Sequence, residues 1–203
     1  MLHPDIELRF VGEHIGYGTF ATQPIPRGTV TWVRDPLDQT FTPAQVEAMA
    51  PPFRAILDKY TFIDARGDFV LCWDHGRFVN HACRPTCLSP GFDFELAVRD
   101  IAAGEELTDD YGTLNLTTGF ECACGAPDCR KVIGPDDLLR YGDQWDALVR
   151  AAFALMPSVP QKLWSLVQEK DRVEAALAGR IEIPSCRVNY AGQHKAGLVG
   201  DGQ

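Results

Sequence analysis

The sequence predicts an α+β fold made mainly of short β-strands, with a helical part near the C-terminus. Short runs of alternating or β-branched apolar residues recur through the first hundred residues, separated by glycine and proline turns. Apolar residues at helical spacing follow Pro135. A length of 203 residues suffices for one well-buried domain with a small appendage.

The strands are expected wherever apolar alternation is bounded by turn residues. Arg66-Gly67 joins two of them, and Ala102-Ala103-Gly104 ends another. The expected strands are residues 6–11, 19–22, 29–34, 61–65, 68–73 and 92–101, with residues 77–79 as the end of a further one.

Residues 42–60 are expected to form two short helices. Thr42 has the features of a helix cap, with Pro43 at the first helical position and Gln45 placed to close a capping box. The first helix should stop near Pro51-Pro52, and the second should run to about Tyr60.

Beyond Pro135 the spacing predicts two antiparallel amphipathic helices, separated by prolines. Their apolar positions are Trp145, Leu148, Val149, Ala152 and Leu155, then Leu163, Leu166, Val167, Val173 and Leu177. These helices either cover the core of the main domain or form a homodimer contact. Residues 184–203 are expected to be a loop followed by a flexible tail.

The composition limits the functional classes. A net charge of −9, from 19 basic and 28 acidic residues, argues against a sequence-independent grip on nucleic acid. No signal peptide or apolar run long enough to cross a membrane is found, so we expect an intracellular, cytoplasmic protein without membrane contact. Seven cysteines in a reducing compartment are typical of metal ligands rather than disulfides.

The stretch from Arg77 to Cys87, RFVNHACRPTC, concentrates chemically specific residues. Asn80 and His81 are hydrogen-bonding residues rather than core formers, and Pro85 stops regular strand pairing. Such a segment turns sharply and suits ligand contact through backbone groups. A hydrogen-bonded turn without a ligand is the alternative.

A second stretch has the spacing C-x-C-x4-C, with thiols at Cys122, Cys124 and Cys129. Glycine, proline and aspartate inside the loop let a short backbone curl round an ion. Three thiolates leave a tetrahedral zinc ion one ligand short. A distant cysteine must complete the site, and Cys87 is the candidate.

Together these segments resemble a SET-domain protein-lysine methyltransferase with a cysteine-rich post-SET zinc segment. The asparagine-histidine motif of that family is NHACRPTC here, its acidic-tyrosine motif is EELTDDYG ending at Gly112, and its glycine motif is Gly16-Tyr17-Gly18. The motifs occur in the expected order over residues 5–134.

The resemblance implies a SET-type fold of several short curved sheets, with a knot-like threading of the segment that leads to Tyr111. It implies a SET domain over residues 5–118, with the variable insert at about 42–60 shaping the substrate groove. A post-SET zinc segment would follow at 119–134, then a helical appendage at 135–183 and the tail at 184–203.

S-adenosylmethionine is the cofactor that the resemblance implies. Backbone groups of Gly16, Tyr17 and Gly18 would contact its methionine end, although a lone GxG can equally be a hairpin turn. Asn80 and His81 would hold its adenosine and amino-acid parts. A further residue, Phe120, could cover the adenine ring. The zinc ion would fold a short segment over the cofactor and substrate.

Tyr111 would be the catalytic residue, orienting the amine and the methyl group through its hydroxyl. Its alternative role is a buried aromatic residue with a satisfied hydroxyl. Methyl transfer to an amine is a direct displacement, so alignment and exclusion of water are the main tasks. The lysine ammonium must first lose its proton, since its ordinary pKa is about 10.4.

Two residues depart from the family pattern. Thr86 stands where an asparagine is usual, which changes a local hydrogen bond. Asp109 stands where the family typically has tyrosine or phenylalanine, at a position that borders the lysine channel beside Tyr111. An ionised Asp109 would attract an ammonium but oppose its nucleophilicity. We hypothesise a channel adapted to an unusual amine or degree of methylation.

The leading functional hypothesis is methyl transfer from S-adenosylmethionine to lysine in a protein or peptide. One alternative keeps the cofactor and changes the acceptor to a small amine or another side chain. The other is a catalytically silent module that binds a lysine-bearing partner. Presence of Tyr111, Asn80 and His81 together favours catalysis, because a scaffold would not need all three.

Overall fold

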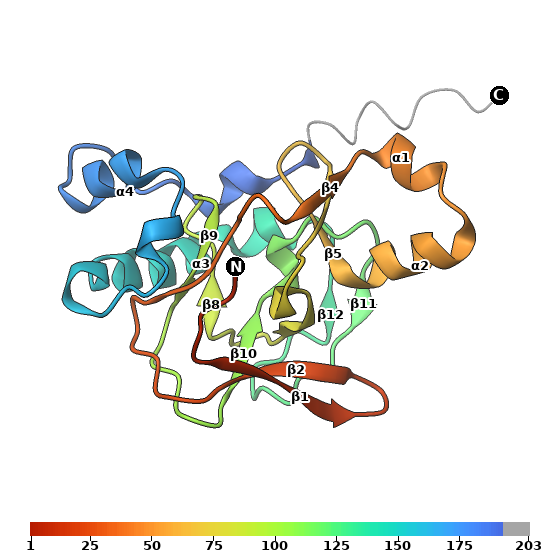
Figure 1. Ribbon diagram of the computed structural model, residues 1–203, viewed down its shortest axis with the longest axis horizontal. Helices are drawn as coiled ribbons and strands as arrows, with labels where there is room; N and C mark the ends of the chain where they lie inside the picture. The colour runs from red at the N-terminus through yellow and green to blue at the C-terminus, as the bar shows by residue number, and fades with distance from the viewer. Residues whose placement is uncertain (193–203) are drawn as a thin grey trace.

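The computed structural model describes residues 1–192, and in them short strands form four small β-sheets (Figure 1). The largest has the order β1-β2-β10-β7, with β1 at Ile6–Gly12, β2 at Gly16–Ala21, β10 at Glu106–Asp109 and β7 at Asn80–His81. A second has the order β3-β9-β8, at Val30–Val33, Phe94–Ala97 and Cys87–Leu88. The predicted α+β fold dominated by short strands is confirmed.

The two remaining sheets belong to the insert and to the cysteine-rich segment. One has the order β4-β6-β5, at Gln39–Phe41, Phe69–Leu71 and Thr61–Ile63. The other pairs β11, Phe120–Glu121, with β12, Val132–Ile133. The turn between β5 and β6 uses Gly67 at a φ of 86°, the left-handed conformation that glycine adopts at least cost.

Helices flank the sheets on two sides (Figure 1). The α-helices are α1 at Pro43–Glu47, α2 at Pro51–Tyr60, α3 at Asp137–Phe153 and α4 at Lys170–Leu177; short 3-10 helices are η1 at His75–Phe78, η2 at Tyr111–Thr113, η3 at Met156–Ser158, η4 at Trp164–Leu166 and η5 at Cys186–Asn189. No helix of residues 1–192 is long and apolar enough to cross a membrane.

The helix signals of the insert are confirmed. Thr42 caps α1, because its hydroxyl accepts from the backbone N–H of Gln45 while the Gln45 side chain accepts from the backbone N–H of Thr42. The second helix, α2, begins at Pro51 and ends at Tyr60, as expected.

Three expected elements differ from the structure. Arg77 and Phe78 end η1 rather than form a strand, because the Asp74 carboxylate caps that turn by accepting from Gly76 N–H, and Val79 follows the helix. The strand expected over residues 92–101 is shorter in the structure, where it consists of β9, Phe94–Ala97. The second C-terminal helix was predicted to start too early, since residues 163–167 form η4 and a loop. The side chain of Gln168 donates a hydrogen bond to the carbonyl of Arg34 and holds this loop.

The C-terminal helices pack on the β3-β9-β8 sheet. Their apolar residues share one buried cluster with the strands, including Phe94, Leu96, Val149, Phe153 and Val173. The interpretation that these helices cover the core of the main domain is therefore confirmed. A second cluster includes Cys87, Ala97 and Leu107.

The expected loose tail is wrong for residues 184–192. Asn115 takes a left-handed φ of 55°, and its amide nitrogen donates to the carbonyls of Ile63 and Asn189. Its oxygen accepts from the backbone N–H of Ala191. These bonds fix the segment against the domain. Residues 193–203 lie outside the described residues.

Parallel pairing of β7 with β10 brings the two central motifs together. Thr108 aligns with Asn80, and Asp109 aligns with His81. Thr86 is the departure from the family pattern noted above. Its hydroxyl accepts from Thr108 N–H at 2.7 Å and donates to the Thr108 carbonyl at 3.0 Å. A threonine can therefore hold this junction in place of an asparagine. The knot-like threading itself stays a prediction.

Candidate functional site: a motif junction with a cysteine cluster

Asn80 joins the glycine turn to the acidic-tyrosine stretch. Its side-chain amide donates to the carbonyl of Tyr17 at 3.1 Å and to Glu106 Oε1 at 2.7 Å. Glu106 was not singled out by the sequence analysis, although it lies within the quoted acidic motif. The first two motifs therefore meet through one amide.

The two glycines of the turn have different roles. Gly16 has a φ of 88° at the end of the β1–β2 hairpin, and a Cβ there would meet nothing. A Cβ on Gly18 would lie 2.3 Å from Glu106 Oε1 and 2.9 Å from Asn80 Nδ2. The hairpin interpretation therefore describes Gly16, whereas Gly18 allows a close approach.

Gly18→Ala is expected to displace the Asn80 amide, because both polar atoms lie nearer than a methyl group tolerates. Loss of the two Asn80 hydrogen bonds should lower the free energy of unfolding by about 1–3 kcal/mol. Chemical denaturation measures this, with Gly12→Ala as the control, because Gly12 lies in the same hairpin without a positive φ and a Cβ there would meet nothing. A Gly18→Ala protein as stable as the wild type would contradict this geometry.

His81, Tyr111 and Phe120 form an aromatic group at the same junction. The ring centroids of His81 lie 5.5 Å from Tyr111 and 5.7 Å from Phe120. His81 Nδ1 accepts from the backbone N–H of Tyr111 at 3.1 Å. Burial lowers the pKa of His81, which favours the neutral ring. Because Nδ1 accepts from Tyr111, the hydrogen of a neutral ring belongs on Nε2.

The Tyr111 hydroxyl is fixed and protonated. It donates to the carbonyl of Val79 at 2.7 Å. Burial, followed by the charges of Asp109 and Glu106, raises the pKa of Tyr111 well above its ordinary value. The hydroxyl oxygen keeps lone pairs with which it can orient a donor.

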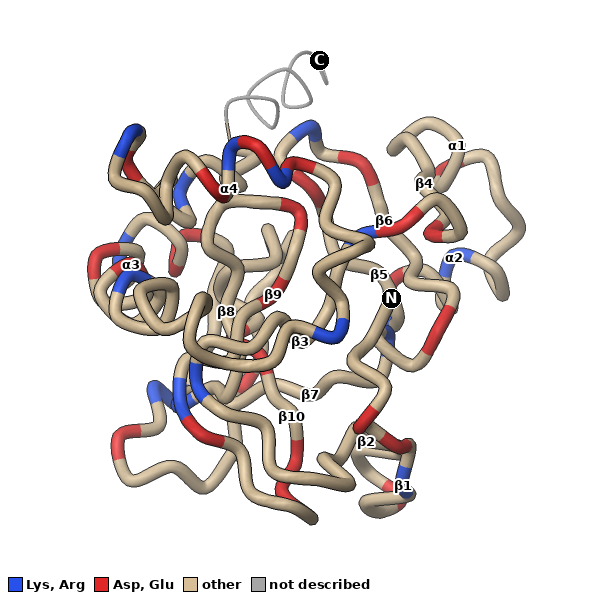
Figure 2. The backbone as a smooth tube through the Cα atoms, turned by 60° about the vertical axis from the view of Figure 1, so that its left-hand side comes forward, with Lys and Arg blue, Asp and Glu red and all other residues tan. Residues whose placement is uncertain are grey.

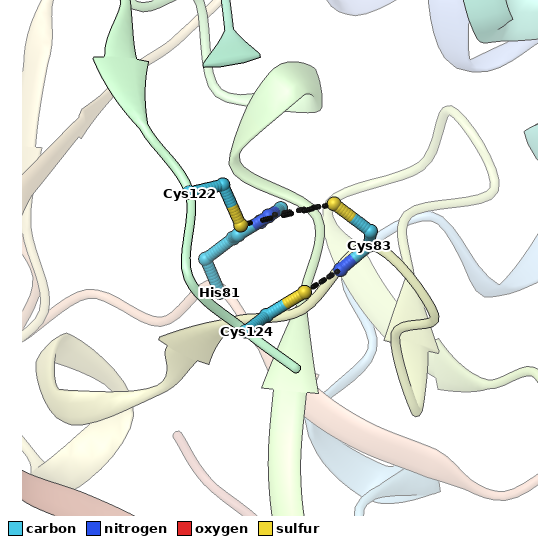
Figure 3. A group of neighbouring side chains, drawn as sticks. All are labelled: His81, Cys83, Cys122 and Cys124. Atoms are coloured by element: carbon cyan, nitrogen blue, oxygen red, sulfur yellow. Dashed lines mark hydrogen bonds between the residues drawn. The ribbon is translucent and has the colours of Figure 1, made fainter. Parts of the chain in front are cut away.

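The cysteine-rich segment brings its thiols to Cys83 (Figure 3). Cys83 Sγ lies 3.8 Å from Cys122 Sγ and 4.0 Å from Cys129 Sγ, and Cys83 N–H points at Cys124 Sγ at 3.5 Å. A tetrahedral zinc ion with Zn–S bonds of about 2.3 Å holds its sulfurs about 3.8 Å apart. These sulfur separations fit such an ion.

His81 is the competing fourth ligand, because its nitrogen lies within 4.8 Å of the sulfurs of Cys83, Cys122 and Cys124. Its Nε2, however, carries the hydrogen and lies 3.5 Å from Cys83 Sγ. That arrangement suits donation to a thiolate rather than metal ligation. Cys129, whose sulfur lies 4.0 Å from Cys83 Sγ, is therefore the preferred candidate for the fourth position.

The prediction of Cys87 as a zinc ligand is wrong. Its side chain is 2% exposed and belongs to the second core cluster, where its Sγ lies 3.6 Å from the Thr86 hydroxyl. Cys83 takes the place beside the other thiols. The sequence held one signal for this: Cys83 stands in the polar turn before Pro85, whereas Cys87 begins an apolar pair with Leu88.

Cys83, Cys122 and Cys124 differ in acidity. Burial raises the pKa of Cys83 to about 12 and also raises that of Cys122. Burial acts in the same direction on Cys124, but hydrogen bonds from the backbones of Cys83 and Ala126 and from neighbouring thiols lower its pKa to about 7. Cys124 is thus more acidic than Cys83 and Cys122.

Arg130 connects this segment to the rest of the site. Its guanidinium donates to both oxygens of Asp110, at 2.8 and 2.5 Å, and lies over the rings of Tyr141 and Trp145 of α3. Asp110 is fully buried and also accepts from Gly112 N–H at 3.0 Å. The sequence analysis did not single out Arg130, because nothing in its local pattern distinguishes it from a surface arginine.

A cavity of about 1060 Å³ opens beside Tyr111. Its walls come from the β3-β9-β8 sheet, the insert and the start of the cysteine-rich segment, and include Trp32, Tyr60, Glu95, Asp109 and Phe120. The insert thus borders a groove beside the junction, as the resemblance implies. Asp109 lies at the inner wall, and Oδ1 of this residue accepts from the backbone N–H of Asp110 at 2.6 Å.

Comparison with known proteins matches residues 16–112 to the family model described as SET domain. A "Histone-lysine N-methyltransferase, H3 lysine-4 specific" of Schizosaccharomyces pombe is 43% identical over 61 residues, which is 27% of this chain and 7% of that protein. "Histone-lysine N-methyltransferase ash1" of Drosophila melanogaster is 42% identical over 67 residues, 29% of this chain and 3% of that protein.

Among solved structures, KRYPTONITE in complex with mCHH DNA, H3(1-15) peptide and SAH has a TM-score of 0.46 at 21% identity, covering 65% of this chain and 30% of that one. This chain spans less than a tenth of the length of the curated relatives named above. The matched range includes the glycine turn, Asn80, His81 and Tyr111. Residues 16–112 are therefore identified as a SET domain.

Proposed function

We propose that this protein transfers a methyl group from S-adenosylmethionine to the side-chain amine of lysine in a protein substrate. The observation that carries the proposal is the junction of β7 and β10 within the SET domain. There Asn80, His81 and Tyr111 lie together beside the glycine turn, and the junction borders a cavity.

S-adenosylmethionine supplies a methyl group on a positively charged sulfur. Asn80, His81 and the backbone of residues 16–18 hold it at the junction, and Phe120 lies edge-on to His81 where an adenine ring can stack. The rings around Tyr111 exclude water. Tyr111 aligns the acceptor nitrogen through its hydroxyl oxygen, so that the displacement proceeds in line.

Zinc has a structural role in this proposal. Cys83, Cys122, Cys124 and Cys129 hold the ion, and the ion fixes residues 120–133 over the junction. This segment has only the short β11–β12 pair as regular structure. A metal that joins it to Cys83 therefore contributes directly to its folding.

A lysine-bearing peptide is the proposed acceptor, and the N-terminal peptide of histone H3 is the first to test, because relatives are named for H3 lysine-4. Lys and Arg are interspersed with Asp and Glu over the described residues (Figure 2). Binding to the phosphate backbone of nucleic acid depends on concentrated Lys and Arg, so this distribution supports the expectation that the protein does not bind nucleic acid directly. A cytoplasmic location and a homodimer through the C-terminal helices stay predictions.

Calorimetric titration of the zinc-loaded protein with S-adenosylmethionine tests the cofactor site. Asn80→Ala is expected to weaken binding about tenfold or more, because it removes the amide that joins the two motifs. Tyr111→Phe should keep the affinity within a few-fold and lower methyl transfer about a hundredfold or more. A folded wild type that does not bind S-adenosylmethionine would contradict the proposal and favour a partner-binding module.

A further inference from the structure

Glu95 carries a carboxyl group that is turned into the protein. It lies on β9 between Phe94 and Leu96, which both point into the first core cluster. Strand alternation directs Glu95 to the opposite face, where Ala97 joins the second cluster. Its Oε2 is buried and has no hydrogen-bond partner among residues 1–192.

Asp109 carries a second carboxyl group that lines the same cavity. Its side chain is 6% exposed, and its only hydrogen bond among residues 1–192 uses Oδ1. Oδ2 is left without a partner in that part of the chain. Glu95 and Asp109 both line the cavity together with Tyr111.

No cation of the described residues pairs with either carboxyl. The titratable groups that interact with them are the Cys87 thiol, the Tyr111 hydroxyl and Asp110, which is already paired with Arg130. Four cations of the chain line the same cavity without pairing with either carboxyl: Arg34, Lys59, Arg66 and Arg77. Burial raises the pKa of Glu95 to about 8. Burial, then the charges of Glu95 and Asp110, raises the pKa of Asp109 well above its ordinary value.

Two neighbouring buried carboxyls cannot both ionise cheaply without a cation. The pair therefore either holds a proton or receives a positive charge from outside the chain. A lysine ammonium is such a charge, and the cavity beside Tyr111 is where the proposed function brings it.

We propose that Glu95 and Asp109 form the receiving site for the acceptor ammonium group and take up the proton that it must lose. This inference rests on the proposed function. The ammonium enters beside one carboxylate and one carboxylic acid. Its N–H bond breaks as an O–H bond forms on Asp109 Oδ2, which leaves a neutral amine with its lone pair and two neutral carboxyls.

This pairing removes the conflict raised by a lone ionised Asp109. A permanently charged carboxylate would hold the ammonium and oppose transfer. A buried carboxylate beside a carboxylic acid attracts the ammonium, but it also accepts the proton readily, because burial disfavours the charged form of a carboxyl group.

Binding of butylammonium, a probe for the lysine side chain, tests the receiving site without methyl transfer. We expect the zinc-loaded protein to bind it in an NMR titration, and Glu95→Gln and Asp109→Asn each to weaken binding about tenfold or more. Asp93→Asn is the matched control, because Asp93 lines the same cavity but is exposed. Butanol should bind alike to all variants. Glu95→Gln binding butylammonium as tightly as the wild type overturns the inference.

Stability against pH gives a second readout. A carboxyl whose pKa rises on folding favours the folded state below its unfolded pKa, and this contribution is lost as the pH rises through the folded value of about 8. The melting temperature of Glu95→Gln should therefore exceed that of the wild type by about 2 °C or more at pH 8.5, and by less at pH 6. A gain independent of pH contradicts the pair.

The proton-uptake step has its own readout. When the rate of methyl transfer is measured against pH, Glu95→Gln should shift the acidic limb of the profile relative to the wild type, whereas Asp93→Asn should not. Absence of transfer by the wild type would defeat the proposed function, while unchanged profiles in a working enzyme would defeat only this inference.

Discussion

Replacing Cys83 with serine is expected to release the zinc ion and to unfold residues 120–133. The hydroxyl is a poor zinc ligand, and the Cys83 sulfur is the link between the cysteine-rich segment and the SET domain, at 3.8 and 4.0 Å from its partners. Structural zinc in such short segments supplies most of their folding free energy. Metal analysis should find about one zinc ion per wild-type chain and a strongly reduced content in Cys83→Ser.

Cys87→Ser is the matched control for this experiment. It changes the same atom four residues away, in a buried position that has no contact with the thiol cluster. We expect it to lower stability somewhat and to retain zinc. A Cys87→Ser protein that loses its zinc while Cys83→Ser keeps it would show that the ligand assignment is wrong.

Arg130→Met is expected to destabilise the protein by about 3–5 kcal/mol. The side chain of Arg130 is only 12% exposed and that of Asp110 is fully buried, so the substitution leaves a buried carboxylate without its cation. The stacking on Tyr141 and Trp145 is lost as well. Chemical denaturation of the zinc-loaded proteins measures the change.

The double variant Arg130→Met with Asp110→Asn separates charge from packing. If the unpaired carboxylate causes the loss, removing its charge should recover much of the stability, and the two changes should not be additive. Additive losses would contradict the Arg130–Asp110 pair as the cause of the instability.

The sequence predicted those parts of the structure that depend on local chemistry. The helix cap at Thr42, the proline at the start of α2 and the β5–β6 turn at Gly67 all require particular residue types at fixed positions. The SET domain was recognisable for the same reason, because its motifs are short and ordered along the chain.

Long-range contacts were harder to predict. Spacing alone does not separate Cys83 from Cys87 as a ligand, and the fold does so by placing Cys87 on β8 with its side chain in the second core cluster. Arg130 and Glu95 have no distinguishing local pattern, because their roles come from residues on other elements. Helical spacing over residues 163–167 was misleading, since Leu163 and Val167 enter the same core from η4 and its flanking loop.

The most direct test of the central claim is methyl transfer itself. Zinc-loaded protein, S-adenosylmethionine and an N-terminal peptide of histone H3 are incubated, and mass spectrometry follows the mass of the peptide. We expect methylation of a lysine by the wild type and almost none by Tyr111→Phe. Equal methylation by both proteins would contradict the assigned role of Tyr111, and a wild type that binds S-adenosylmethionine yet methylates no lysine-bearing peptide would contradict lysine as the acceptor.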